Sequence, residues 1–500
     1  MNNMFIKIAM LVIFFSVLAG IGIYCRKHAS STSQFVLGGR NVGPWMTAFA
    51  YGTTYFSAVV FVGYAGQFGW NFGVSAAWIG LGNALIGSLL AWIVLARRTR
   101  LATKHYESAT MPDFFAKRYN SANLRVIVSV IIFVFLVPYS ASVYKGLSGL
   151  FSMAFGIDFI YCIIGMAVIT AIYVILGGYM AAVVNDFLQG IIMLAGIVAV
   201  IFSVLNVNGG LMESLNLLSQ IPANSAAEST GALTSLFGPD PLSLLSVIIL
   251  TSLGAWGLPQ MVHKFYTIKS TKIIKTGAIV STIFAIVVAG GSYFMGSFGR
   301  LFYTPNGAIQ YDAIVPQMLS VLPELLIGLV VILVLSASMS TLSSLVITSS
   351  STFTLDFLKP LLKNGMKPKS EVLIIRALCG FFVLLSVIIA INPNSLITSL
   401  MSLSWGVLAG SFLGPFIYGL YWKGTTKLAV YASFTCAIII NVWNLLVPFT
   451  TPPNAGALSI VASLIIVPLV SFITPKLKKE HVEDAFSCYT KENREATENN

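Results

Sequence analysis

The sequence predicts an all-α protein that crosses a lipid bilayer about thirteen times. The first observation is composition: of 500 residues, 57% are hydrophobic and only 9% are charged, whereas a soluble domain has roughly 25% charged residues. The second is a series of apolar segments of about 20 residues, each long enough to cross a hydrocarbon core of ~30 Å. Lipid tolerates only helices and closed barrels, and barrel strands need only about 10 alternating residues, so these segments are expected to be helices.

The helices are placed in chain order from these apolar runs and the polar segments between them. The first run is interpreted as a membrane anchor, because its basic residues Arg26 and Lys27 follow it and no small-residue cleavage site precedes them. The expected spans are 4–25, 44–68, 72–96, 123–155, 158–177, 179–205, 241–266, 274–302, 324–358, 370–391, 394–422, 426–448 and 455–474.

Charge predicts the orientation of these spans. All but three of the 29 Lys and Arg residues fall in 26–40, 97–125, 264–275, 359–376, 423–427 and 476–494. These segments are every second connection, as expected when positive residues stay in the cytoplasm. The long connection 206–240 on the other side has no Lys or Arg. We therefore expect the N-terminus outside, the C-terminus in the cytoplasm and an odd number of spans.

Several function classes are disfavoured. The net charge is +12. The Lys and Arg residues that produce it lie in alternate loops and do not form one basic patch, so they indicate the orientation in the membrane and no nucleic-acid partner. The five cysteines and four histidines have no metal-ligand spacing, and no catalytic motif is present. We expect no enzyme activity, no cofactor and no required protein partner. Transport across a membrane, the plasma membrane in our prediction, is the class that remains.

Two spans carry helix breakers at positions typical of transporter binding sites. The second span has Gly52 followed by two threonines, and the seventh has Gly254, Gly257 and Pro259 in one short run. A proline inside a helix removes a backbone donor, and secondary transporters bind ions and solutes where such breaks free carbonyls near the bilayer midplane. Glycine and proline are also common in membrane helices, so either break alone is weak. The five-span separation of the two fits two five-helix inverted repeats.

Five motifs then resemble the sodium:solute symporter family, in particular its sodium/proline and sodium/pantothenate branches. They are LGGRNVGPW (37–45), FAYGTTYFSAVVFVGYAG (49–66), ILGGYMAAVVNDFLQG (175–190), WGLPQMVHKF (256–265) and SASMSTLSS (336–344). The resemblance covers essentially the whole chain and implies a leucine-transporter-like fold. The implied organisation is an extra helix and link at 1–43, a first repeat at 44–205, an extracellular loop at 206–240, a second repeat at 241–422, two further helices at 423–474 and a cytoplasmic tail at 475–500.

The ninth span carries an unusual stripe of oxygen-bearing side chains. In 336–351, ten of sixteen residues have a hydroxyl, and at 100° per residue Ala337, Ser340, Thr341, Ser344 and Thr348 share an arc of about 100°. Small hydroxyl residues also serve helix packing and bond back to their own carbonyls, which is the alternative for any single serine. The family resemblance implies a sodium site with the carbonyls of Thr53, Phe56 and Ala337 and the hydroxyls of Ser340 and Thr341.

Asp186 lies in an apolar span, where an ionised carboxylate is expensive and a functional role is the default hypothesis. A structural acid near a helix end is the alternative. Some members of the family hold a second sodium ion at the equivalent acid. The resemblance implies that Asp186, Ser340, Ser343 and Ser344 would form such a site here, with sodium as the only metal.

The resemblance also implies a solute cavity lined by Tyr55, Ser57, Tyr139, Trp256, Ser404 and Trp405. Proline transporters of the family carry an Asp at the position of Tyr55, so this chain departs from them there, and aromatic residues at such positions often serve packing alone. Lys145 lies within an apolar helix; it either extends towards the outer surface or faces the cavity, where it would attract a carboxylate.

These observations predict a sodium-coupled symporter that imports a small organic solute by alternating access. A carboxylate-bearing solute is favoured, such as an amino acid, a pantothenate-like compound or a monocarboxylate. The alternatives are a neutral solute such as a sugar, carried by the same fold, or a passive ion channel. A channel would call for a ring of repeated filter residues, whereas this chain has internal pseudo-repeats.

Overall fold

The chain is helical almost throughout. The computed structural model describes residues 2–25, 31–223, 230–305, 307–362, 366–392 and 395–498. Within these ranges the only extended pairing is an isolated bridge between Val42 and Ile268, and eleven helices are long and apolar enough to cross a membrane. The predicted all-α polytopic membrane protein is confirmed, whereas the number thirteen is not.

The helices up to residue 219 are α1 (Asn2–Cys25), α2 (Thr32–Leu37), α3 (Pro44–Tyr55), α4 (Ala65–Phe72), α5 (Ala77–Gly82), α6 (Arg97–His105), α7 (Met111–Arg118), α8 (Ala122–Phe155), α9 (Phe159–Val207) and α10 (Leu211–Ser219). Those that follow are α11 (Pro241–Ile248), α12 (Pro259–Thr267), α13 (Ile274–Ala285), α14 (Gly291–Gly296), α15 (Tyr311–Ser320), α16 (Glu324–Thr352), α17 (Lys359–Leu361), α18 (Pro368–Ala390), α19 (Ile397–Tyr421), α20 (Lys427–Leu446), α21 (Pro452–Ile473) and α22 (Lys479–Glu498). Short π-helical or 3-10 segments join several of them, including η3 (Val59–Tyr64), η5 (Asn83–Leu90), η8 (Ile249–Leu253), η9 (Gly254–Trp256) and η13 (Phe353–Leu358).

The difference in span number arises where one continuous helical run contains a sharp turn or where a span is split. Val59–His105 is a single run of 47 residues, turned at Gly73, whose φ is 60°. In α9, Gly178 has φ 60° and ψ −168° and separates the shorter apolar helix Phe159–Ile172 from the span Gly178–Val207. Glycine adopts positive φ without a steric penalty. The predicted boundary at 177–179 therefore coincides with a real turn.

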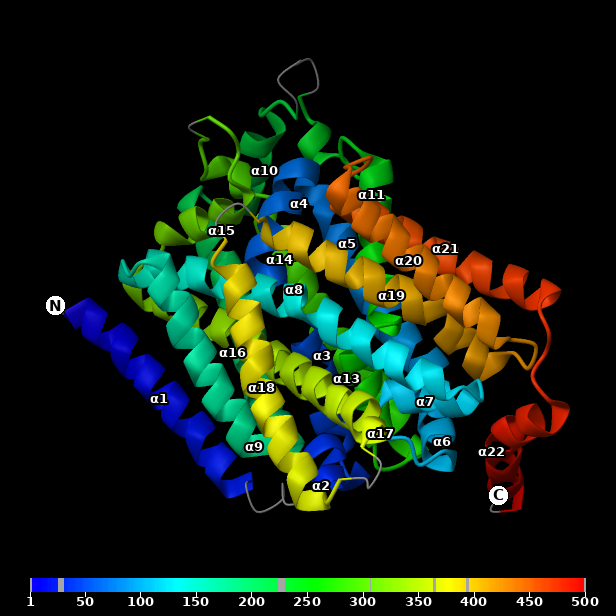
Figure 1. Cartoon of the computed structure of the whole chain (residues 1–500). Helices are drawn as coiled ribbons and strands as arrows, with labels where there is room; N and C mark the ends of the chain where they lie inside the picture. The colour runs from blue at the N-terminus through cyan, green and yellow to red at the C-terminus, as the bar shows by residue number, and fades with distance from the viewer. Residues whose placement is uncertain are drawn as a thin grey trace.

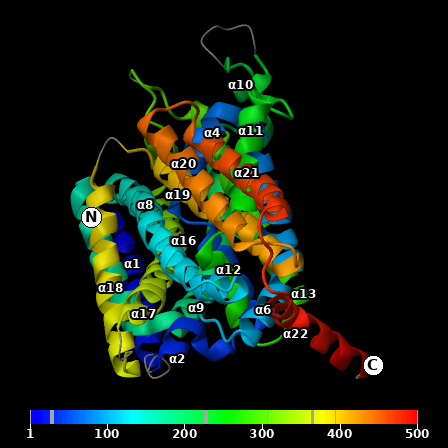
Figure 2. The same ribbon diagram turned by 45° about the vertical axis from the view of Figure 1, so that its right-hand side comes forward.

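The core of the bundle is built around α16. This helix packs against α1, α3, α8, α9 and α18, and Figure 1 shows it among them near the middle of the molecule. Its residues from Val330 to Thr352 are all buried, including every hydroxyl of the predicted stripe. Helices α19, α20 and α21 pack against one another away from α1 (Figure 2), and α19 also packs against α8.

The two ends of the bundle differ in the segments that they carry. Figure 1 places α10, from the connection 206–240, at one end, and α2, α17 and α22 at the opposite end. The last three lie in or beside the Lys- and Arg-rich segments of the sequence. The structure thus separates the two sets of connections, as alternating charge requires, while the side of the membrane that each faces stays a prediction.

Candidate functional site

The first predicted helix break is present at Tyr55–Ser57. Helix α3 ends at Tyr55, and Phe56 adopts an extended conformation with φ −114° and ψ 108°. The helix then resumes and passes into η3. Because the chain leaves helical geometry here, carbonyls in the last turn of α3 lose their usual N–H partners. The break therefore leaves oxygens of Thr53 and Thr54 available in a fully buried position.

The second predicted break lies between α11 and α12. The chain passes from π-helical η8 to 3-10 helical η9, Leu258 is extended with φ −79° and ψ 124°, and α12 begins at Pro259. Proline fits the first position of a helix because its missing N–H has no partner there. The carbonyl of Thr251, just before this break, accepts a hydrogen bond of 2.5 Å from the Tyr55 hydroxyl. The side chain of Tyr55 at the first break is thus in direct contact with the backbone just before the second break.

The hydroxyl stripe of α16 faces the break after α3. Thr341 Oγ1 lies 3.4 Å from the Thr53 carbonyl oxygen, 3.1 Å from that of Thr54 and 3.1 Å from that of Ala337. The Ser340 hydroxyl donates a 2.8 Å hydrogen bond to Thr53 Oγ1. These residues are fully buried. The result is a cluster of neutral oxygens, which is the donor set suited to a hard cation at an unwound helix.

Not every predicted member of the cluster is joined to it. Among the described residues, no hydrogen bond connects Phe56 with α16; its N–H bonds to the Gly52 carbonyl at 3.3 Å. Other hydroxyls of α16 bond only to their own helix, as the packing alternative expects: Ser351 and Thr352 donate to the Thr348 carbonyl at 3.2 and 2.8 Å. Some hydroxyls of α16, such as those of Ser340 and Thr341, therefore reach α3, whereas others bond within the helix.

Asp186 lies opposite a basic residue that the sequence analysis counted only as a loop charge. Its carboxylate is fully buried, and neither oxygen has a hydrogen-bond partner among the described residues. Lys264 Nζ, on α12, lies 3.6 Å from Asp186 Oδ2 and donates a 3.1 Å hydrogen bond to Ser344 Oγ. Ser344 also reaches Thr54 Oγ1 at 3.0 Å, while Ser343 donates to the Ser340 carbonyl at 2.9 Å.

Three of the predicted cavity residues form an aromatic cluster. The rings of Tyr55 and Trp405 are stacked with centroids 6.0 Å apart, and Tyr139 meets Trp405 edge-on at 5.9 Å. The Tyr139 hydroxyl and the Trp405 Nε1 are buried without a hydrogen-bond partner among the described residues. Unpartnered polar atoms at the rim of buried rings are suited to a bound solute.

The other predicted cavity residues have partners elsewhere. Ser57 Oγ accepts from the Val59 N–H at 3.3 Å, Trp256 Nε1 donates to the Ile86 carbonyl at 2.9 Å, and Ser404 donates to the Phe135 carbonyl at 2.5 Å. Asn83, a buried amide on η5, joins this region without having been predicted from the sequence. Its Oδ1 lies 3.5 Å from the Tyr55 hydroxyl and accepts from Ser252 at 3.1 Å.

Tyr55 also lies against Gly87 in a very close contact. A Cβ atom added at Gly87 would lie 2.1 Å from the Tyr55 hydroxyl oxygen. The Gly87 carbonyl in turn accepts a 2.7 Å hydrogen bond from the Tyr51 hydroxyl. The absence of a side chain at Gly87 is therefore what makes room for the tyrosine at the break.

Lys145 does not turn towards this aromatic cluster. Its ammonium group donates to the carbonyls of Asn392 and Ser395 and, at 3.1 Å, to Ser395 Oγ, so it is held at the connection between α18 and α19. The side chain is 6% exposed. Of the two alternatives for Lys145, the contacts do not support the one in which it faces the cavity, because its ammonium group is held by the segment between α18 and α19.

Cavities flank the break region unequally. A hollow of about 390 Å³ lies on the side of α10 and is lined by residues of α4, α11 and the start of α19, including Phe68, Val247 and Ser399. On the opposite side, beside Lys264 and Ser344, only about 10 Å³ remains, which is close to the volume of one water molecule. The region between the breaks is therefore closed towards the end that carries α2 and α22.

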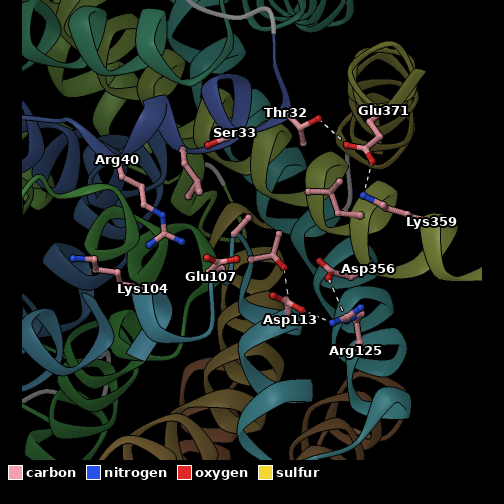
Figure 3. A pocket seen from close by; sticks show the side chains of 14 residues that line it. Thr32, Ser33, Arg40, Lys104, Glu107, Asp113, Arg125, Asp356, Lys359 and Glu371 are labelled. Carbon is pink, nitrogen blue, oxygen red and sulfur yellow. Dashed lines mark hydrogen bonds and ion pairs between the residues drawn. The ribbon is translucent and has the colours of Figure 1, made fainter. Parts of the chain in front are cut away.

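A cavity of about 680 Å³ lies away from both breaks, at the end that carries α2. Figure 3 shows two groups of paired charges in its lining: Arg125 contacts Asp113 and lies 3.9 Å from Asp356, and Lys359 lies 2.5 Å from Glu371. Thr32 donates a 2.7 Å hydrogen bond to the same glutamate. These contacts connect the ends of several helices, which favours a structural role for the lining of this cavity over a solute site.

Known proteins match this chain over most of its length. A model of the sodium:solute symporter family matches residues 35–435. Sodium/proline symporters of Staphylococcus aureus strains, including JH9 and USA300, are 32% identical over 492 residues, covering 94% of this chain and 92% of theirs.

Two solved structures share the fold. A Na⁺-coupled sialic acid symporter in a substrate-bound outward-open state is 18% identical, with a TM-score of 0.79 and coverage of 95% of this chain and 98% of its own. A nucleobase-cation-symport-1 family transporter in a closed conformation is 15% identical, with a TM-score of 0.54 and coverage of 91% and 98%. The chain therefore belongs to the sodium:solute symporter family, and it is a membrane transporter and not an enzyme.

Proposed function

We propose that the protein imports a small organic solute together with Na⁺ across the plasma membrane by alternating access. One observation carries the proposal: the Thr341 hydroxyl lies among the carbonyl oxygens of Thr53, Thr54 and Ala337 where α3 is broken. Sodium needs several oxygen ligands, and neutral oxygens give a weak, reversible site, as coupling requires. The proposed first sodium site consists of Thr53, Phe56, Ala337, Ser340 and Thr341.

The proposed architecture is a leucine-transporter-like pair of inverted repeats at 44–205 and 241–422. The two helix breaks, one in each repeat, support this division. The further parts are the segment 1–43, the loop 206–240, two helices at 423–474 and the tail 475–500. Thirteen spans, with the N-terminus outside and the C-terminus in the cytoplasm, stay part of the proposal. The separation of the basic segments from α10 supports the proposed orientation.

For the solute we propose a carboxylate-bearing compound, with an amino acid as the first candidate because the Staphylococcus aureus relatives are named sodium/proline symporters. Tyr55, Ser57, Tyr139, Trp256, Ser404 and Trp405 are the proposed cavity residues. The aromatic cluster with the unpartnered atoms of Tyr139 and Trp405 supports their role. A tyrosine in place of the acid of proline transporters argues against proline itself.

Uptake by the purified protein in liposomes tests the proposal. The panel contains proline, other amino acids, pantothenate, monocarboxylates and a sugar, each measured with an inward sodium gradient and with potassium replacing sodium. We expect sodium-dependent accumulation of one carboxylate-bearing class above its outside concentration. Accumulation of a sugar alone would favour the neutral-solute alternative, and sodium current without accumulation of any solute would favour the channel.

The second sodium site, at Asp186, Ser340, Ser343 and Ser344, stays a prediction. Its acid is buried and lacks a hydrogen-bond partner among the described residues, which favours a bound cation. The position of Lys264 decides which cation that is.

A further inference from the structure

The Asp186 carboxylate already has a cation within reach. Lys264 Nζ lies 3.6 Å from Asp186 Oδ2, and the exposed fractions of the two side chains are 1% and 0%. A buried carboxylate needs one positive charge to compensate it, because desolvation penalises an isolated ion heavily. Lys264 supplies that charge from within the chain.

Lys264 also uses an oxygen that a second sodium ion would need. Its ammonium group donates to Ser344 Oγ at 3.1 Å, and Ser344 is one of the predicted ligands of that ion. The face of Tyr179 lies on another side of the ammonium group, 5.3 Å from the ring centre. The acid, the hydroxyl and the ring therefore surround the ammonium group, and each favours a cation.

A further ion would have to lie beside the ammonium group. The cavity next to Lys264, which Gln260 and Thr348 also line, holds about 10 Å³, about the least that takes one water molecule. A sodium ion bound to Asp186 and Ser344 would lie close to the ammonium group, and two positive charges near one carboxylate repel each other strongly in a medium of low dielectric constant. Sodium at Asp186 therefore requires Lys264 to leave.

The ammonium group is coupled to the proposed first sodium site through the Ser344 hydroxyl. Ser344 joins Lys264 on α12 to Thr54 on α3, with 3.0 Å between Ser344 Oγ and Thr54 Oγ1. The carbonyl of the same Thr54 contacts Thr341. The contacts thus connect α9, α12, α16 and α3 on the side of the breaks where the cavity is almost closed.

We propose that Lys264 is the resident cation of the Asp186 cluster, so that it takes the place of a second sodium ion and the protein binds one Na⁺ in the proposed first site. The inference rests on the proposed function only in that Na⁺ is the coupling ion. Lys264 acts here as a positioning residue: its ammonium group holds Asp186 and Ser344, and through Ser344 it holds Thr54.

Equilibrium binding of radioactive sodium to the purified full-length protein tests this inference without knowledge of the solute. Choline chloride keeps the ionic strength constant. We expect the wild type to bind one ion with a hyperbolic curve. The double variant Asp186→Asn/Lys264→Gln, in which both charges are replaced by neutral groups of similar size, should bind the same single ion. A wild type that binds two ions, of which the double variant loses one, would overturn the inference.

The single variants sharpen the test. Lys264→Gln leaves the carboxylate without its cation, so we expect a second bound ion and a Hill coefficient above one. Lys264→Arg keeps the charge and should behave as the wild type does. A merely structural lysine would change the amount of folded protein but not the number of ions bound. Should Lys264→Gln fail to fold, the double variant still decides.

Failure of the proposed function would look different. Thr341→Ala should lower the affinity for the single sodium ion that the wild type binds. An unchanged affinity would contradict the first sodium site, while the comparison of wild type and double variant would still test Lys264. If the wild type binds no sodium, the coupling proposal fails. Appearance of sodium binding in Lys264→Gln alone would then support Lys264 as the resident cation, and its absence would overturn that role.

Discussion

Thr341 Oγ1, on α16, lies 3.1 Å from the carbonyl oxygen of Thr54, on α3, and therefore joins the hydroxyl stripe to the helix break. Replacing Thr341 with Ala removes one oxygen of several, so we expect sodium binding to weaken by about 1–3 kcal/mol, or roughly five- to 150-fold in half-saturating sodium. Ser340→Ala should have an effect in the same range. Sodium-dependent uptake in liposomes measures both.

The matched control is Thr352→Ala. Thr352 lies on the same helix and is buried, but its hydroxyl donates only within α16, to Thr348 and Ser349 at 2.8 and 3.0 Å. Its removal should leave the sodium dependence unaltered. Equal behaviour of Thr341→Ala and Thr352→Ala would mean that the entire stripe serves packing.

Orientation is open to direct labelling. Single cysteines or epitope tags in 206–240 should react with impermeant reagents applied outside intact cells, and tags in 359–369 should react only after the membrane is made permeable. The reason is the concentration of Lys and Arg in the second group of connections. Inverted labelling would contradict the orientation and the repeat assignment that depends on it.

The Tyr55 hydroxyl is expected to shape the solute cavity more than the sodium site. Tyr55→Phe removes the 2.5 Å hydrogen bond to the Thr251 carbonyl and leaves that oxygen buried, which costs about 1–3 kcal/mol in the states that contain the bond. We expect a changed half-saturating solute concentration with an unchanged half-saturating sodium concentration. Uptake titrated separately in solute and in sodium distinguishes the two. A shift in sodium dependence alone would place Tyr55 in the ion site.

Asp312, on α15, makes the stability of the segment before α16 depend on pH. Burial raises the pKa of its carboxyl group to about 6 from 3.8, against the opposing effects of the Ile397 N–H, which it accepts at 3.2 Å, and of Lys145. Between pH 6 and about 4 the folded protein binds a proton that the unfolded chain does not. The contribution of Asp312 to the free energy of unfolding therefore rises as the pH falls through this window.

We expect this change in the melting temperature of the purified protein. Relative to Asp312→Asn, the wild type should become more stable between pH 7 and pH 5. Asp240→Asn is the control, because hydrogen bonds from Ser243 lower the pKa of Asp240 below its usual 3.8, and its contribution is lost only in more acidic solution. A constant difference between wild type and Asp312→Asn would contradict the assigned titration.

The breaks and the stripe were predictable from the sequence because their signals are local. The loss of helical geometry is predicted within a few residues of where it occurs by Gly52 with its two threonines and by the run from Gly254 to Pro259. A helix with ten hydroxyls in sixteen positions is similarly visible. The number of spans does not follow from apolar runs alone, because Gly73 and Gly178 turn the chain inside continuous helical runs.

Lys264 and Asn83 were missed because their roles depend on distant partners. Lys264 precedes a basic loop, so its charge was interpreted as an orientation signal, yet Asp186 lies 78 positions earlier in the chain. Asn83 stands in an apolar span, and its polarity was a usable signal that went unused. Only the packing of η5 against η8 shows that it meets Tyr55 and Ser252.

The close contact between Tyr55 and Gly87 has a consequence for how this transporter can change its solute. A methyl group at position 87 has no room while the tyrosine is present, and a smaller side chain at position 55 would leave the space beside Gly87 empty. Productive changes at the two positions are therefore expected in pairs. A library that varies residues 55 and 87 together should yield new specificities that no scan of single substitutions at either position can reach.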